Sequence, residues 1–318
     1  MAKVFLTRKI PDIGIDLLKK NHEVSIFSDS NNPNKKQLIE NAQNADAIIS
    51  LLSDEIDKEV INKCNNLKVI ANYAVGYDNI DLKAAQENNI VVTNTPGVLT
   101  EATADLTWTL LLAAARRIVE SDKFVRNLKF DGWGPELLLG RKTHGKTLGI
   151  IGFGRIGQAV AKRAQGFNMN ILYNKRTPLD QAEESKLGVE FAKLDKLLKD
   201  SDFITINASL NDSTYHLIDE KEFEKMKDNA IVVNTGRGPI INENALVKAL
   251  KQKEIFGAGL DVYEEEPKVN PELLELDNVI LTPHTGSATT YARNEMAEMV
   301  AKDVLAVMDG NEPVNRVV

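Results

Sequence analysis

The sequence predicts an α/β protein with two doubly wound parallel sheets, and three observations lead to this prediction. The chain has 318 residues, more than a single domain usually contains. Short apolar runs alternate with polar stretches of helical spacing, which is the pattern of βα units. The alternation occurs in two series, one before residue 94 and one after residue 147, separated by a long apolar segment. Two sheets are therefore expected.

The first series forms one expected parallel sheet with helices between its strands. Apolar residues in 11–20 and 34–43 recur at helical spacing, so each of these stretches is expected to be a helix. The expected strands are residues 3–7, 23–27, 46–52, 67–73 and 89–94.

A turn, a helix and a loop separate the two series. Pro96 and Gly97 break the chain in "NTPGV". Residues 101–127 then form one expected helix, apolar enough to be buried and long enough to connect two domains. A loop rich in glycine follows at 130–147.

The second series predicts another parallel sheet and a final helix at 289–310, ended by Gly310. The most economical arrangement inserts a nucleotide domain, residues 100–286, into a first domain made of residues 1–99 and 287–318. The pattern alone does not show that the last helix rejoins the first domain. The expected strands are residues 147–152, 170–173, 203–207, 230–235, 257–262 and 279–283.

Charge and cysteine content exclude several classes of protein. A formal net charge of −7 argues against a nucleic acid or an anionic membrane as partner. One cysteine, Cys64, allows no intrachain disulfide and fits a reducing compartment. No signal peptide and no apolar run long enough to span a membrane is recognisable, so a cytoplasmic location is expected.

A glycine-rich loop in the second series predicts a dinucleotide site. Gly152, Gly154 and Gly157 follow an apolar strand and open a helix, and another strand comes about twenty residues later. The first glycine allows a tight turn, the second lets the backbone approach a pyrophosphate, and the third lets helix and strand pack closely. The pyrophosphate is expected at the helix N-terminus, where unpaired N–H groups favour anions. The simpler alternative is an ordinary strand–turn–helix joint.

The end of the next strand predicts which dinucleotide binds. In NAD sites an acid at this position accepts hydrogen bonds from the ribose 2′-hydroxyl, whereas cations suit the 2′-phosphate of NADP. Here Asn174 stands in place of the acid, and Lys175, Arg176 and Thr177 follow it. NADPH is therefore expected to be preferred over NADH. The alternative is a solvated basic turn that accepts either cofactor, since Asp180 lies too far along the loop to substitute.

Candidate catalytic residues follow three other strands of the second series. His284 comes after a strand and is surrounded by small residues, which leave room for a working imidazole. Arg237 stands between glycines and suits an anion, although it could be a capping residue. Asp261 and Glu266 follow a further strand, and the neighbouring Glu264 and Glu265 are interpreted as a solvated acidic turn. Ligands of open α/β sheets gather at these strand ends.

Several motifs together resemble the D-isomer-specific 2-hydroxyacid dehydrogenase family over essentially the whole chain. The branch that reduces glyoxylate and hydroxypyruvate is the most similar. This resemblance implies a Rossmann nucleotide domain inserted into a flavodoxin-like substrate domain. Ser209 departs from the proline that the family often has there. The motifs are "ANYAVGYDNID", "TNTPGVLTEATADL", "GIIGFGRIG", "YNKRTP", "NTGRG", "GAGLDVYEEEP" and "LTPHTGSA".

The resemblance also implies roles for individual residues. Arg237 would bind the carboxylate of a small 2-keto acid, His284 would protonate its carbonyl oxygen, and Glu266 would hydrogen-bond the imidazole. Val75 and Gly76 would offer backbone N–H groups to the same carboxylate. A homodimer is implied, with Trp133 reaching the partner's active site. The remaining expected cofactor contacts are Phe153, Gly154, Arg155 and Ile156 at the pyrophosphate, Thr235 and Asp261 at the nicotinamide end, and Gly236 and Gly286.

Two other functions remain open at this point. A corepressor-like protein that senses dinucleotides could share the fold, but it would not need Arg237, Glu266 and His284 together. A formate- or phosphite-type dehydrogenase would act on smaller anions. The pairing of glutamate with histidine argues against formate, where the partner of the histidine is normally an amide.

Overall fold

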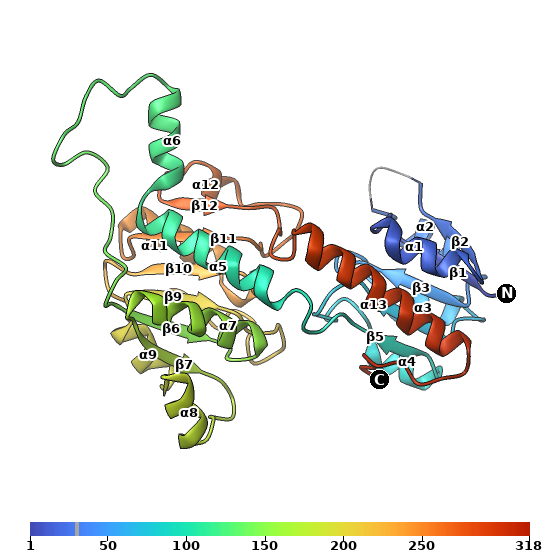
Figure 1. The fold of residues 1–318 in the computed structure, drawn as a ribbon. Coiled ribbons are helices and arrows are strands. Elements are labelled where there is room, and N and C mark those ends of the chain that lie inside the picture. The colour runs from blue at the N-terminus through green and yellow to red at the C-terminus, as the bar shows by residue number, and fades with distance from the viewer. Residues whose placement is uncertain (29–31) are drawn as a thin grey trace. The chain divides into compact units, whose positions relative to one another are not determined.

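The computed structural model describes residues 1–28 and 32–318. These residues form two compact units (Figure 1). The first unit contains residues 1–99 and 287–318, and the second contains residues 100–286.

The first unit is built on a five-stranded parallel sheet with the order β2-β1-β3-β4-β5. This is the strand order of flavodoxin-like folds. Helices α1 and α13 pack against each other, and the Cβ of an alanine at Gly14 would lie 2.5 Å from the Ala297 carbonyl oxygen. The strands are β1 Lys3–Leu6, β2 Glu23–Ile26, β3 Ala47–Ser50, β4 Val69–Asn72 and β5 Val91–Thr93; the helices are α1 Asp12–Lys19, α2 Lys35–Ala42, α3 Lys58–Lys63, α4 Leu82–Glu87 and α13 Thr290–Met308.

The second unit is built on a seven-stranded parallel sheet with the order β12-β11-β10-β9-β6-β7-β8. Counted from β6, this is the Rossmann order 3-2-1-4-5-6 with one further strand. The strands are β6 Thr147–Ile151, β7 Asn170–Asn174, β8 Glu190–Phe191, β9 Phe203–Ile206, β10 Ile231–Asn234, β11 Gly257–Leu260 and β12 Val279–Leu281; the helices are α5 Thr100–Ala115, α6 Ile118–Arg126, α7 Arg155–Ala164, α8 Gln181–Leu187, α9 Leu194–Asp200, α10 Glu220–Phe223, α11 Glu243–Gln252 and α12 Pro271–Leu274, with short 3₁₀ turns η1 Gln165–Phe167 and η2 Gly238–Ile240.

The prediction of one buried connecting helix over 101–127 is wrong. The chain forms two helices, α5 and α6, which are separated by Arg117 in the left-handed region (φ 53°). The Arg141 N–H donates to the Ala115 carbonyl oxygen at 2.7 Å, so this carbonyl is not free to continue the helix. Helix α5 is buried within the second unit against β10, β11 and α7, whereas α6 has no buried residue.

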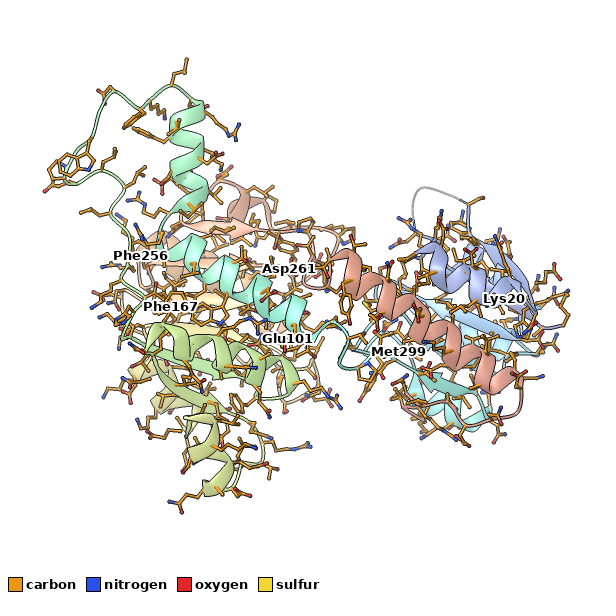
Figure 2. All side chains as sticks on the ribbon, viewed as in Figure 1. Lys20, Glu101, Phe167, Phe256, Asp261 and Met299 are labelled. Carbon is orange, nitrogen blue, oxygen red and sulfur yellow. The ribbon has the colours of Figure 1, made fainter. Side chains whose placement is uncertain are left out.

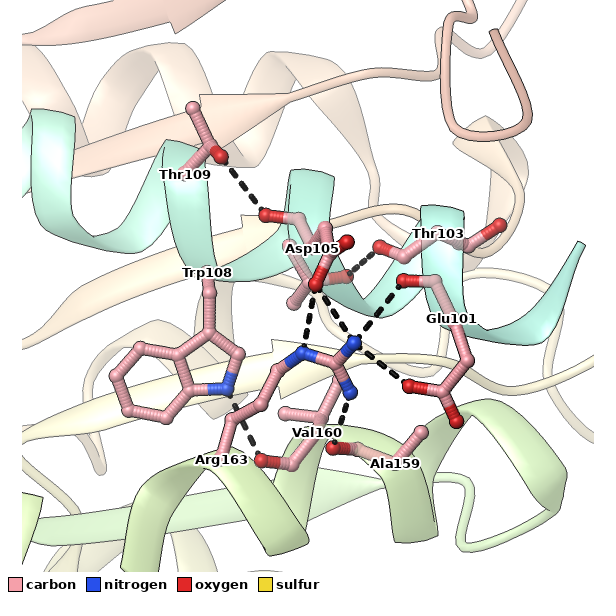
Figure 3. A network of polar contacts seen from close by, with 9 residues as sticks. Glu101, Thr103, Asp105, Trp108, Thr109, Ala159, Val160 and Arg163 are labelled. Carbon is pink, nitrogen blue, oxygen red and sulfur yellow. Dashed lines mark hydrogen bonds and ion pairs between the residues drawn. The ribbon is translucent and has the colours of Figure 1, made fainter. Parts of the chain in front are cut away.

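Helix α5 is fastened to α7, the helix that follows the glycine-rich loop (Figure 3). The Arg163 guanidinium contacts Asp105 at 2.6 and 2.8 Å and Glu101 at 2.7 Å. The indole N–H of Trp108 donates to the Val160 carbonyl oxygen at 3.0 Å. These contacts join the two helices side by side and hold α7 in place over the sheet.

The last two features of the fold are the single cysteine and the absence, among the described helices, of a membrane span. Cys64 is buried, and burial raises the pKa of its thiol to about 11, as expected for a structural cysteine. Among the described helices, none combines the length and the apolarity needed to cross a bilayer.

Candidate functional site

The predicted catalytic residues follow neighbouring strands of the second unit. Strands β10, β11 and β12 pair in parallel, with Asn234 opposite Leu260 and Leu260 opposite Leu281. The segments that leave these strands therefore start at the same edge of the sheet. They carry Arg237, Asp261, Glu266 and His284.

His284 and Glu266 form a close pair. The Nδ1 of His284 lies 2.8 Å from Glu266 Oε2, and Glu266 Oε1 accepts the Tyr263 N–H at 3.1 Å. The carboxylate is thus fixed by the backbone on one side and orients the ring on the other. The side chain of His284 is 24% exposed, and within the described part of the chain its Nε2 has no partner. This nitrogen is available to an incoming ligand.

Asp261 supports the loop that carries His284. The Asp261 carboxylate is 1% exposed, and Figure 2 labels the residue beyond β11. Its Oδ1 accepts the Thr282 hydroxyl at 2.6 Å and the Thr285 N–H at 2.7 Å, while Oδ2 accepts the Gly286 N–H at 2.7 Å. These bonds hold His284 in the left-handed region (φ 53°), which a residue with a side chain rarely adopts. Sequence reasoning assigned both Asp261 and Gly286 to the cofactor and missed this support.

Arg237 lies in a tightly packed turn after β10. Its carbonyl oxygen accepts the Asn234 side-chain N–H at 2.9 Å, and its Nη1 donates to the Gly236 carbonyl oxygen at 3.1 Å. At Gly238, an added Cβ would lie 1.8 Å from the Tyr263 carbonyl oxygen. The turn that carries Arg237 therefore packs directly against the Tyr263 backbone, three residues before Glu266.

The glycine-rich loop has the geometry that a dinucleotide site requires. Gly152 has a φ of +88°, and a Cβ there would lie 2.4 Å from the Ala208 nitrogen. A Cβ at Gly157 would lie 2.3 Å from the Gly152 carbonyl oxygen. At Gly154, by contrast, a Cβ would meet nothing within 4 Å. This glycine leaves open space beside the helix N-terminus, which is where a pyrophosphate would approach.

The first turn of α7 can hold an anion through its backbone. Gly154 is the N-cap and offers no side chain to the first N–H groups of the helix. The Phe153 ring is buried, and its centroid lies 4.4 Å from the centroid of the Tyr173 ring. Only the backbone of Phe153 is therefore available to a ligand. Arg155 is exposed and Ile156 is half-buried. The residues present thus fit a dinucleotide.

The end of β7 presents an amide and two cations. The Asn174 side-chain N–H donates to the Ala192 carbonyl oxygen at 2.8 Å. Lys175 is half-buried, Arg176 and the following Thr177 are exposed, and neither cation pairs with a carboxylate of the described chain. Asp180 caps α8, and its Oδ1 accepts the Glu183 N–H at 2.8 Å.

Thr235 lies at the end of β10 and is buried. Its hydroxyl contacts the Thr107 hydroxyl at 2.7 Å and accepts the Asn207 side-chain N–H at 3.0 Å. The remaining predicted residues lie elsewhere. Val75 and Gly76 belong to the first unit, in the loop after β4, and Trp133 lies in the loop after α6 with 85% of its surface exposed.

A second histidine–glutamate pair was not foreseen. His216 Nε2 lies 2.6 Å from Glu264 Oε1, so the prediction of a solvated turn is wrong for Glu264. The second Glu264 oxygen accepts the Glu243 N–H at 3.0 Å, and the Glu243 carboxylate accepts the Glu264 N–H at 2.7 Å. Burial raises the pKa of Glu243. No local sequence signal links His216 to an acid 48 residues away.

Comparison with known proteins decides the family. Residues 108–286 match the NAD binding domain of the D-isomer specific 2-hydroxyacid dehydrogenases. The chain belongs to the D-isomer specific 2-hydroxyacid dehydrogenase family. It is 53% identical to the glyoxylate reductase of Thermococcus litoralis, over 99% of this chain and 96% of that protein.

Solved structures support membership of this dehydrogenase family. A Thermus thermophilus protein has a TM-score of 0.93 and 44% identity, covering 99% of this chain and all of that one. The NADPH-dependent glyoxylate/hydroxypyruvate reductase of Sinorhizobium meliloti, solved with NADP and malonate, has a TM-score of 0.87 and 29% identity, covering 100% and 97% of the two chains. The chain is therefore an NAD(P)-dependent D-2-hydroxyacid dehydrogenase, and the predicted family, fold and enzyme class are confirmed.

Proposed function

We propose that this dehydrogenase reduces a small 2-keto acid, glyoxylate or hydroxypyruvate, to the D-2-hydroxy acid and prefers NADPH. The observation that carries the proposal is the His284–Glu266 pair, whose outer ring nitrogen is unoccupied at the carboxyl edge of the sheet. The name of the Thermococcus litoralis relative supports the choice of substrate. When bound, the reduced nicotinamide supplies a hydride to the substrate carbon.

His284 is the proposed acid. Negative charge develops on the keto oxygen during reduction, and a proton on Nε2 of His284 neutralises it. The ring keeps its orientation because Nδ1 is held by Glu266. Once Nε2 has given up its proton, the neutral imidazole must take another from solvent before the next turnover, and its partial exposure permits this.

Arg237 is the proposed carboxylate ligand in the second unit. A guanidinium offers a fork of donors that matches a carboxylate and fixes the keto group in one orientation. The tight packing of Gly238 on the Tyr263 backbone fixes the position of the backbone from which the Arg237 side chain extends. We also propose that the first unit is the substrate domain and supplies the N–H groups of Val75 and Gly76.

The proposed preference for NADPH is supported by the residues at the end of β7. Asn174, held by the Ala192 carbonyl oxygen, is uncharged at the position where an acid would repel a 2′-phosphate, and Asp180 caps α8 further along the loop. Lys175 and Arg176 are free to approach the phosphate. A phosphate dianion gains more from two cations than a pair of hydroxyl groups does.

Absorbance of the nicotinamide band, followed with each keto acid and each cofactor, tests this function. Turnover with NADPH is expected to exceed turnover with NADH by tenfold or more, about 1.4 kcal/mol. A Lys175→Ala/Arg176→Ala double variant should lose this preference while its Kd for NADH stays unchanged. Equal use of both cofactors by the wild type would refute the preference. Tight NADPH binding without turnover of any 2-keto acid would favour a dinucleotide sensor instead.

We propose a homodimer that forms through α6 and the loop after it. Figure 2 shows α6 and this loop projecting from the rest of the second unit. A depression of about 780 Å³, lined in part by Arg117, Val119 and Phe256, lies at the base of α6 on the same unit. In a twofold dimer each copy must carry both complementary surfaces, here the projecting segment and the depression. The exposed large apolar residues of this segment are Ile118, Val119, Val125, Leu128, Phe130, Trp133, Leu137 and Leu139.

A charge in this apolar segment is expected to produce monomers. Leu139 is 60% exposed, and Leu139→Asp should shift the mass measured by light scattering from dimer to monomer, because a buried unpaired carboxylate is costly. Leu274 is a matched control, since it is 64% exposed on α12 and outside the segment. Leu274→Asp should remain dimeric. If Leu139→Asp is also dimeric, the proposed interface is wrong.

A further inference from the structure

Three successive carbonyl groups in the loop after β4 are each held by a donor. The Ala74 carbonyl oxygen accepts the Thr95 N–H at 2.9 Å. The Val75 carbonyl oxygen accepts the Asn94 side-chain N–H at 2.7 Å, and the Gly76 carbonyl oxygen accepts the Asn72 side-chain N–H at 2.7 Å. Two of these three donors are side-chain amides.

The direction of these carbonyls sets the direction of the following N–H groups. A trans peptide is planar, so its C=O and N–H point in opposite directions. The N–H groups of Val75, Gly76 and Tyr77 are therefore turned away from the three donors. Within the described part of the chain, none of the three makes a hydrogen bond, although nearly all buried backbone donors are paired in folded proteins. Val75 and Gly76 are half-buried, which leaves their N–H groups for a ligand.

Asn72 is itself locked in place by a buried polar network. Its Oδ1 accepts the Ser50 hydroxyl at 3.0 Å, and its amide donates to Asn79 at 3.2 Å. The Asn79 amide in turn donates to the carbonyl oxygens of Leu51 and Asp54 at 3.1 and 3.0 Å. Buried amide networks of this kind restrict side chains to one arrangement. Asn72 can therefore hold the Gly76 carbonyl in only one direction.

We propose that Asn94 and Asn72 are positioning residues that turn the N–H groups of Val75, Gly76 and Tyr77 toward the carboxylate of the keto acid. This inference rests on the proposed function and adds the Tyr77 N–H as a third donor. Successive backbone N–H groups carry partial positive charge and suit an anion. Asn94 and Asn72 would not touch the substrate, because their amides are occupied by the Val75 and Gly76 carbonyls.

Asn94→Leu tests the proposal, because leucine has nearly the same size and no donor. The KM for the keto acid is expected to rise tenfold or more, while kcat at saturation and the Kd for NADPH stay unchanged. The Kd of oxamate, an unreactive analogue of a 2-keto acid, should rise by the same factor when measured by calorimetry with NADPH present. Asn94→Ser, whose hydroxyl is too short to reach, should behave alike and serves if the leucine variant does not fold.

Asn88→Leu is the matched control in the same unit. The Asn88 amide donates to the Ala84 carbonyl oxygen at 2.9 Å, so this variant loses the same kind of bond away from the loop. It should keep the wild-type KM and oxamate Kd. The proposal is overturned if both Asn94 variants keep these constants within twofold, or if they lose kcat alone. A wild type that binds oxamate but reduces no keto acid would refute only the proposed function, whereas one that does not bind oxamate would refute the present inference too.

Discussion

Replacement of His284 by alanine is expected to lower kcat for keto-acid reduction by roughly 10²- to 10⁴-fold, the usual contribution of a general acid. Without the imidazole, the proposed proton donor to the keto oxygen is lost. The Kd for NADPH should not change, because the glycine-rich loop and the end of β7 are untouched. Stopped-flow turnover and fluorescence titration measure the two quantities separately.

The second histidine–glutamate pair provides a matched control for this experiment. The side chains of His216 and Glu264 are 26% and 24% exposed, and those of His284 and Glu266 are 24% and 29% exposed. His216→Ala therefore removes a histidine of the same burial and partner type from the same unit. It should retain most of the wild-type kcat. Comparable losses in both variants would mean that His284 supports the structure and is not the acid.

Gly238→Ala is expected to destabilise the protein by about 3 kcal/mol or more. The added Cβ would lie 1.8 Å from the Tyr263 carbonyl oxygen and 1.9 Å from its carbon, and backbone atoms cannot rotate away as a side chain can. Either the second unit unfolds at lower denaturant concentration, or the Arg237 turn separates from the segment before Glu266. Chemical denaturation gives the free energy, and kcat/KM reports the displacement.

Gly166→Ala is the control for the steric clash expected at Gly238. It shows whether any replacement of glycine by alanine in this unit destabilises the protein. A Cβ at Gly166 would meet nothing within 4 Å, and its backbone is not in the left-handed region. This variant should be neutral or slightly more stable, since alanine reduces the freedom of the unfolded chain. A Gly238→Ala protein as stable as Gly166→Ala would contradict the packing described for the turn.

Much of the fold could be predicted because strands buried on both faces form continuous apolar runs. Every predicted strand is present, within a few residues at its ends. The break between α5 and α6 was missed because it depends on Arg141 reaching the Ala115 carbonyl, a contact between distant residues. Strand β8 was missed because two residues, Glu190 and Phe191, carry no periodic signal.

In the candidate site, too, some features could be predicted from the sequence and others could not. Gly152, Gly154 and Gly157 were predictable because backbone conformation and close packing demand glycine at the first and third positions. The partners of Asp261 were not, because the contacts that use its carboxylate come from residues 21 to 25 positions later. Sequence spacing indicates which strand end carries a residue, but not what its side chain touches.

The hydrogen bonds of Asp261 fix the last residues of the second unit in place. The second unit ends at Gly286, and the chain then passes into the first unit at Ser287. His284 therefore lies two residues before the end of the second unit. Asp261 anchors the N–H groups of Thr285 and Gly286, so the backbone next to His284 is tied to the second unit just before the chain leaves it. The His284 ring and the Glu266 carboxylate are therefore both held by contacts within the second unit.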